Sequence, residues 1–278
     1  MRIDAHLHLW DLDRVAYPWL TESLGPIHRT FSMEEAEPQL VEAGIDRVVL
    51  VQAANSDEDS RAMFAVAAES ERVGGVVAWI DLLDPARAER QLDGWAEHPS
   101  FVGVRHLIHD EPDPDWLGRS DVHESLALLA DRELAFDVVG VLPRHLEHAL
   151  ALADELPGLH LVIDHLGTPP VGAADMEPWR SLMSELGAHP NTFVKLSGLT
   201  TLGPSGHATA VDLQPFVDHV LEAFGAARIL YGGDWPVSTL AGSYRETLAV
   251  ADELLAGISE PERRSVFGDS AMTAYRMS

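Results

Sequence analysis

Three histidines and one aspartate in this chain could together bind a metal ion or activate a water molecule. His6 and His8 are two residues apart, and side chains at that spacing point to the same side of a β-strand. Paired imidazoles suit a divalent ion such as Zn²⁺. His165 and Asp234 each follow a short apolar run. We therefore predict a site of three imidazoles and one carboxylate that holds zinc; the alternative is a metal-free site in which the imidazoles donate hydrogen bonds directly.

These four residues need a scaffold that brings distant parts of the chain together. Short runs rich in Val, Ile and Leu predict strands at residues 2–9, 47–53, 73–81, 101–108, 134–140, 160–165, 192–197 and 228–233. The runs lack the polar alternation of a half-exposed sheet, which is typical of parallel strands covered on both faces.

Helices with readable ends separate most of these strands. The clearest starts are Asp84-Pro85, which combines a cap with a proline at the first helical position, and two pairs that fit a capping box, Ser32 with Glu35 and Asp121 with Glu124. Gly44 ends the first of these helices. Further helices are predicted at 143–156, 178–186, 213–224, 244–256 and 260–267.

Strands and helices that alternate in this way predict an α/β fold, a single-domain (β/α)8 TIM barrel over residues 1–278. A doubly wound open sheet is the alternative, but its glycine-rich phosphate turn is absent, because Gly74 and Gly75 lead into a strand. In a barrel the carboxyl ends of the strands meet at one mouth. The barrel therefore predicts that His6, His165 and Asp234 converge there.

The amino-acid composition limits the kinds of molecule that this protein could bind. The chain has 19 Lys and Arg against 45 Asp and Glu, a formal charge of −26, which argues against nucleic acid or an anionic membrane as partner. The absence of cysteine excludes a disulfide scaffold, a thiolate metal site and a cysteine nucleophile. Without an apolar run of about 18 residues or a signal-peptide pattern, we expect a cytoplasmic protein with a small-molecule substrate. The sequence leaves homo-oligomerisation open.

Motifs along nearly the whole chain resemble the amidohydrolase superfamily. Within it the chain is similar to the amidohydrolase-2 group, in particular the sugar-lactonase branch with fuconolactonase, rhamnonolactonase and pyrone-dicarboxylate lactonase. The motifs are IDAHLHLWDL at 3–12, YPWL at 17–20, FVGVRHLIHDEPDPDWL at 101–117, AFDVVG at 135–140, PRHLEHALALA at 143–153, VIDHLGTPP at 162–170, VKLSGL at 194–199 and YGGDWPVS at 231–238. Two positions depart from the lactonase pattern, Thr168 where lysine is usual and Gly233 where serine is usual.

The resemblance implies a hydrolase that opens a small lactone, a sugar aldono-lactone or a carboxylated one. Asp234 is the candidate general base, and His165, with His6 and His8, either holds a metal or polarises the carbonyl. Alternatives are a zinc decarboxylase of a carboxylated diene and an inactive barrel that binds a metabolite. Binuclear chemistry is not expected, because Lys195 lies on the predicted seventh strand and the fifth carries no lysine to be carboxylated.

Other residues near the predicted mouth are candidates for substrate binding. Arg105 and His106 are neighbours in one strand, so only one can point inward; Arg105 would suit a carboxylate, and His106 sugar hydroxyls. Lys195, the only lysine, is a third candidate, and a barrel-rim ion pair is its alternative. Aromatic candidates, for which plain packing is equally expected, are Trp19, Trp116 and Trp235. Asp4 and Asp164 could orient an imidazole, although strand alternation points both away from the histidines beside them.

Overall fold

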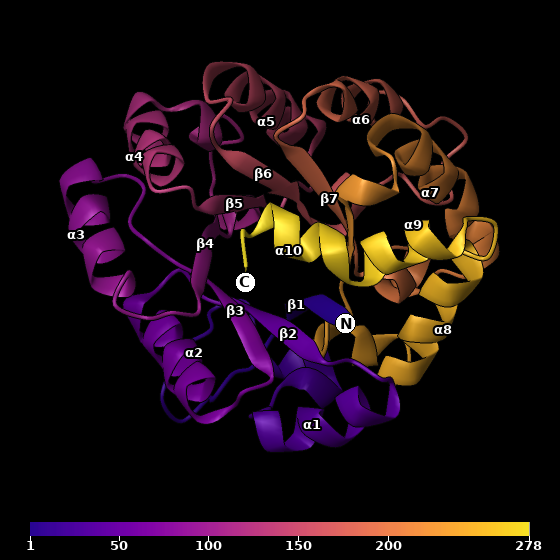
Figure 1. Ribbon diagram of the computed structural model, residues 1–278, viewed down its shortest axis with the longest axis horizontal. Helices are drawn as coiled ribbons and strands as arrows, with labels where there is room; N and C mark the ends of the chain where they lie inside the picture. The colour runs from indigo at the N-terminus through magenta and orange to yellow at the C-terminus, as the bar shows by residue number, and fades with distance from the viewer. Residues whose placement is uncertain (278) are drawn as a thin grey trace.

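Parallel strands pair in chain order around a common axis. The computed structural model describes residues 1–277, and within that range eight strands form one sheet in the order β1 to β8, as Figure 1 shows. Their bounds are β1 Ile3–Leu7, β2 Arg47–Val51, β3 Val73–Ala78, β4 Phe101–His106, β5 Ala135–Val138, β6 His160–Ile163, β7 Thr192–Leu196 and β8 Ile229–Tyr231. Leu7 pairs with Trp235, just beyond β8, and brings the two ends of the sheet together. The predicted TIM barrel is confirmed.

Helices cover the outside of the barrel (Figure 1). They are α1 Met33–Glu42, α2 Asp57–Glu69, α3 Pro85–Trp95, α4 Ser120–Asp131, α5 Pro143–Glu155, α6 Trp179–Ala188, α7 Ala210–Phe224 and α8 Tyr244–Leu254. None of the helices in the described range is long and apolar enough to cross a membrane.

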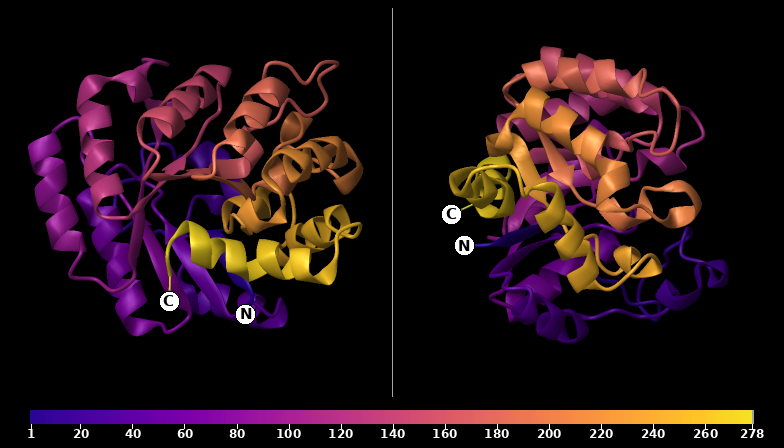
Figure 2. Two further views of the ribbon diagram at one scale, coloured as in Figure 1. Left: turned by 45° about the horizontal axis from the view of Figure 1, so that its top comes forward. Right: turned by 90° about the vertical axis from the view of Figure 1, so that its right-hand side faces the viewer.

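The last part of the chain closes the amino-terminal end of the barrel. Helices α9 (Glu260–Arg264) and α10 (Ser270–Ala274) are joined by a π-helical turn and cross the barrel (Figure 1), and both termini lie on this side (Figure 2). Inward-facing apolar side chains of the strands, such as Val49, Val162 and Phe193, pack here against Ala271 and Tyr275. This end of the barrel is therefore filled, and the opposite end is left for a site.

Several predicted boundaries were wrong in a consistent way. The predicted strands run one to three residues too far at their carboxyl ends, because the apolar pattern continues into the loops of the mouth. Helix α2 was missed, although Ser56 caps it by accepting the backbone N–H of Asp59. Ser32 makes no capping bond, and the side chain of Glu35 pairs with Arg29.

Two further helix starts were also misplaced. Helix α4 begins at Ser120, so Asp121 lies in its first turn and does not cap it. Helix α7 begins three residues before the prediction, because Thr209 and Asp212 form a capping box. The cap predicted at Asp84 is confirmed, with the carboxylate accepting the backbone N–H of Arg87 at 3.0 Å.

Asp84→Ala is expected to lower the free energy of unfolding by about 1 kcal/mol, because the cap of α3 is lost. Ser32→Ala is the matched control at the start of α1, where no capping bond exists, and its effect should stay within about 0.5 kcal/mol. Urea denaturation of both variants measures the difference. Equal losses would show that the Asp84 contact contributes nothing.

Candidate active site

Three ligand atoms meet where the sheet closes. His6 lies in β1, His8 one residue beyond it, and Asp234 three residues beyond β8. The His6 Nε2 and His8 Nε2 atoms are 3.1 Å apart, and Asp234 Oδ1 lies 3.8 Å and 3.5 Å from them. Backbone bonds from Asp234 N to His6 O and from His8 N to Trp235 O hold the two segments together. The hydrogen bonds that close the barrel therefore also set the spacing of this group.

These atoms fit a small divalent ion. Ligands at about 2.0–2.1 Å from a tetrahedral zinc are separated by about 3.3 Å, and the three distances bracket that value. His8 Nδ1 lies 2.7 Å from the carbonyl oxygen of Val51, which can only accept, so Nδ1 carries the proton and Nε2 keeps a lone pair. Two imidazoles and one carboxylate leave a fourth position for water or substrate.

His165 reaches the same region through an irregular turn. It follows β6 in the short 3₁₀ segment Asp164–Gly167, and its φ of 52° is left-handed. Its Nδ1 lies 2.9 Å from Ser197 Oγ, and its ring centroid lies 4.7 Å from that of His6. Burial lowers the pKa of His165, which keeps the imidazole neutral. Asp164 follows the inward-facing Val162 by two residues and points inward with it, so the expectation that Asp164 points away from the histidines was wrong. The left-handed backbone at His165 brings that ring to the same side, against strand alternation.

Asp164 belongs to a buried group of charges beneath the histidines. Its Oδ2 accepts from Arg105 NH1 at 3.0 Å, and its Oδ1 lies 3.0 Å from Lys195 Nζ and 3.3 Å from His6 Nδ1. Burial alone would raise the pKa of Asp164, but Lys195, His6 and Arg105 lower it to well below its ordinary value. Burial, reinforced by Lys195, lowers the pKa of His6. Asp164 is therefore a carboxylate and His6 a neutral imidazole.

Asp4 supports the site through backbone groups. One carboxylate oxygen accepts the N–H groups of His6 and Gly233, and the other accepts the hydroxyl of Tyr244. Asp4 thus ties β1 to the segment before Asp234, and it contacts no imidazole. A Cβ atom on Gly233 would lie 2.5 Å from the Tyr244 ring, so the usual serine of the lactonase pattern has no room here.

A cavity of about 220 Å³ opens above these groups. Its polar wall contains both His8 and Asp234, and residues from the loops of the mouth complete it. The lining is His8, Trp19, Ala53, Arg105, Leu107, His109, Val139, Val141, His165, Asp234 and Val237. The cavity is small and largely apolar, with its titratable groups at the barrel axis.

His109 was missed by the sequence analysis. It lies in the 3₁₀ turn Ile108–Asp110 directly after β4, and burial lowers its pKa. Its place one turn beyond a strand end, inside the motif that carries Arg105, was the signal that could have found it. Trp19 lines the cavity and donates its Nε1–H to the carbonyl of Ala53 at 2.6 Å.

Of the two neighbouring candidates in β4, Arg105 lines the cavity and His106 does not. Arg105 points inward and His106 outward, as alternation requires. The His106 ring accepts from Trp79 Nε1, lies 2.7 Å from Glu111 Oε1 and stacks on Trp116. Arg105 NH1 donates to Asp164 and NH2 to the carbonyl of Gln52, so two of its five N–H donors are already used within the protein.

Lys195 and Trp235 are also buried away from the cavity. Lys195 has no exposed surface, and Trp235 is 1% exposed and packs edge-on against Phe31. Their expected substrate contacts are not supported by these positions. The alternative for Lys195, an ion pair, is what the structure contains, but within the barrel rather than at its rim.

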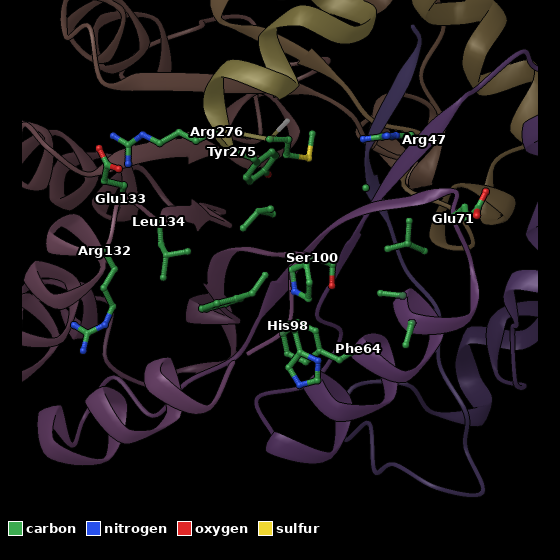
Figure 3. A pocket seen from close by; sticks show the side chains of 18 residues that line it. Arg47, Phe64, Glu71, His98, Ser100, Arg132, Glu133, Leu134, Tyr275 and Arg276 are labelled. Atoms are coloured by element: carbon green, nitrogen blue, oxygen red, sulfur yellow. The ribbon is translucent and has the colours of Figure 1, made fainter. Parts of the chain in front are cut away.

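A larger pocket of about 670 Å³ lies at the other end of the barrel (Figure 3). It opens beside the amino-terminal ends of β2 to β5, next to Arg47 and Leu134, with Tyr275 and Arg276 from the tail. Chemistry in TIM barrels gathers at the carboxyl ends of the strands. The smaller cavity, which contains the clustered histidines, is therefore the candidate active site.

Comparisons with known proteins find relatives that match along nearly the whole chain. A sequence model described as "Amidohydrolase" (Amidohydro_2) matches residues 3–277. An L-fucono-1,5-lactonase of Burkholderia ambifaria is 38% identical over 99% of this chain and 96% of its own. A second, from Burkholderia multivorans, is 30% identical over 100% of this chain and 96% of its own. The crystal structure of an amidohydrolase from Burkholderia multivorans with bound zinc aligns over 100% of both chains, with a TM-score of 0.92 and 29% identity.

A TIM barrel with His6 in its first strand, His8 directly after that strand and Asp234 after its last strand, matched along its length by an amidohydrolase model, is a barrel enzyme of the hydrolase class. The chain belongs to the amidohydrolase family.

Asp59 holds one wall of the mouth and should make stability depend on pH. It accepts the N–H groups of Ala53 and Ala54 and the hydroxyl of Tyr17, and burial raises its pKa from 3.8 to about 6. A raised carboxyl pKa stabilises the fold below the unfolded pKa, and this contribution is lost as the pH rises through 6. From pH 5 to pH 8 the loss is about 1.4 kcal/mol.

The side chain of the Asp59→Asn variant cannot ionise, so the variant should not lose this stability as the pH rises. The difference in free energy of unfolding between the native chain and the variant should therefore fall by about 1.4 kcal/mol between pH 5 and pH 8. Urea denaturation at both pH values measures this. The control is Asp218→Asn on the exposed face of α7, whose effect should be the same at both. A constant effect of Asp59→Asn would contradict the raised pKa.

Proposed function

We propose that this protein is a zinc-dependent lactonase that opens a sugar aldono-lactone. The observation that carries the proposal is the meeting of His6, His8 and Asp234 at the floor of a small cavity, at distances that suit one zinc ion. Relatives at 38% and 30% identity are L-fucono-1,5-lactonases, and a relative of very similar fold was crystallised with zinc. The first finding supports the reaction, and the second supports the ion.

Asp234 acts as the general base in this proposal. Its Oδ1 lies within 4 Å of both imidazoles and its side chain lines the cavity, so it can take a proton from the attacking water. When bound, zinc supplies Lewis acidity that polarises the lactone carbonyl and favours ionisation of water. The protonated Asp234 then returns its proton to the ring oxygen as the ester bond breaks, so the reaction begins and ends with the same carboxylate.

Neutral imidazoles at the cavity wall orient the ring. His165 has its Nδ1 bonded to Ser197, which leaves Nε2 free to contact a hydroxyl or the carbonyl of the substrate. His109 lies across the same cavity and offers a second polar contact. Trp19 and the apolar wall formed by Leu107 and Val139 suit the nonpolar face of a single ring. A cavity of about 220 Å³ favours one small ring over an oligosaccharide.

Asp234→Asn should reduce kcat for L-fucono-1,5-lactone by about 100-fold to 10,000-fold, because the amide cannot accept a proton. Acid release followed with a pH indicator, corrected for spontaneous hydrolysis, measures this. Asp218→Asn removes the same charge from an outer helix and should keep the native rate. An Asp234→Asn variant as fast as the native enzyme would remove the base. If no lactone releases acid while a carboxylated diene loses carbon dioxide, the enzyme is a lyase.

Removing the metal should abolish lactone hydrolysis, and one equivalent of zinc should restore it. His8→Gln should weaken zinc binding by at least about 100-fold, because a ligand nitrogen is lost. His123→Gln on the outer helix α4, where the imidazole pairs with Glu155, is the control and should bind zinc normally. Metal analysis and competition with a chromophoric chelator give the readout. Full activity after chelation would show that the reaction needs no metal.

A further inference from the structure

A turn in the long segment between β1 and α1 forms part of the cavity wall. Residues 17–20 make this turn, and Leu20 N donates to Tyr17 O at 3.0 Å to close it. Trp19 lines the cavity, whereas the side chain of Tyr17 is buried and does not line it. The turn therefore places one aromatic side chain at the cavity and another inside the protein.

The hydroxyl of Tyr17 donates to a buried carboxylate. Tyr17 Oη lies 2.9 Å from Asp59 Oδ1, and Asp59, in the first turn of α2, is only 1% exposed. Burial, reinforced by the charge of Asp59, raises the pKa of Tyr17 well above its ordinary value, so the hydroxyl keeps its proton and donates. Hydrogen bonds to charged groups are stronger than those between neutral groups. The turn is therefore bound firmly to the start of α2.

The other oxygen of Asp59 holds the loop after β2. Asp59 Oδ2 accepts the backbone N–H groups of Ala53 at 2.7 Å and Ala54 at 3.1 Å. The carbonyl of Ala53 in turn accepts the indole N–H of Trp19 at 2.6 Å. Two connections therefore join the turn to this loop, one through Tyr17 and Asp59 and one directly from the Trp19 ring.

These contacts limit what Trp19 can offer to a ligand. The indole N–H is the only hydrogen-bonding group of a tryptophan side chain, and Ala53 already uses it. The Trp19 ring also meets the buried ring of Trp10 edge-on, with the centroids 5.5 Å apart. Trp19 therefore presents carbon alone to the cavity, which suits the C–H face of a small ring.

We propose that Tyr17 is a positioning residue that acts through Trp19, by holding the aromatic wall on which the ring of the substrate binds. When the bond between Tyr17 and Asp59 is lost, the turn keeps only the bond from the Trp19 indole to Ala53. That remaining bond then opens more often, and the ring leaves the wall. The role of the wall in binding rests on the proposed lactonase reaction, whereas the position of Trp19 is a property of the chain without substrate.

Exchange of the Trp19 indole proton with water is the direct test, and NMR of the ¹⁵N-labelled protein measures it without a lactone. Each of the seven tryptophans contributes one indole cross-peak, and that of Trp19 is assigned by its loss in Trp19→Phe. Tyr17→Phe should speed this exchange by about 10-fold to 100-fold, because a hydrogen bond to a charged group is removed. Asp59→Asn should also speed it, since the amide nitrogen cannot accept. Native exchange rates in both variants would overturn the proposal.

Tyr275→Phe is the matched control for a general loss of stability. The Tyr275 hydroxyl also donates to a buried carboxylate, that of Asp137 at 2.9–3.0 Å, and Tyr275 borders the pocket at the opposite end of the barrel (Figure 3). The control thus loses the same kind of bond far from the turn. Its Trp19 proton should exchange at the native rate. Equal acceleration in Tyr17→Phe and Tyr275→Phe would mean that Tyr17 contributes stability alone, and the proposal would be wrong.

Steady-state kinetics with L-fucono-1,5-lactone test the consequence for binding. Tyr17→Phe should raise KM by about 10-fold, the worth of one aromatic contact, and keep kcat within about 3-fold, because the polar groups at the barrel axis are unchanged. If Tyr17 acts through Trp19, the KM of Tyr17→Phe/Trp19→Ala should equal that of Trp19→Ala. Effects on KM that multiply in the double variant would show that Tyr17 acts independently of Trp19, against the proposal.

These readouts distinguish failure of this inference from failure of the proposed reaction. A chain without lactonase activity whose Trp19 exchange responds to Tyr17→Phe would contradict the reaction and support the positioning of Trp19. An active lactonase whose Trp19 exchange ignores both Tyr17→Phe and Asp59→Asn would contradict this inference alone.

Discussion

Charges without access to water lie on the axis of this barrel, and the rest of the site depends on their mutual neutralisation. Asp137, Asp164 and Lys195 are fully buried and Arg105 nearly so, and a single unpaired member would cost several kcal/mol. Each cation contacts a carboxylate at 3.0 Å or less. The strands can therefore hold the charges only in one register, and that register places His6 above them, between the buried group and the cavity.

Closure of the sheet and assembly of the site are the same structural event. The carboxylate of Asp4 joins the N–H groups of His6 and Gly233, and the N–H of Asp234 donates to the carbonyl of His6. A displacement between the first and last strands would change the spacing of the ligand atoms by the same amount. The position of these ligands therefore follows from backbone hydrogen bonds, which are less variable than the conformations of exposed side chains.

The two ends of the barrel have different tasks. Apolar strand residues and the tail with Tyr275 fill the amino-terminal end, so no water reaches the charges from below. Loops of varied length form the other end and provide Trp19 and His109 to the cavity. This division is typical of TIM barrels, in which the loops at the carboxyl ends of the strands vary to fit a substrate.

The sequence by itself determined the order of strands and helices and hence the barrel, because apolar periodicity is a local property of the chain. It also determined that His6, His8, His165 and Asp234 meet, because each lies at or just beyond a strand end and a barrel brings these ends together at one mouth. It did not determine where strands end. Tertiary structure decided that the backbone turns left-handed at His165, which brings this ring to the same side as Asp164 against the alternation rule. Tertiary contacts alone also decided which side chains lie beneath the ligands, because a buried charge is stable only beside its partner, and that partner is distant in the chain.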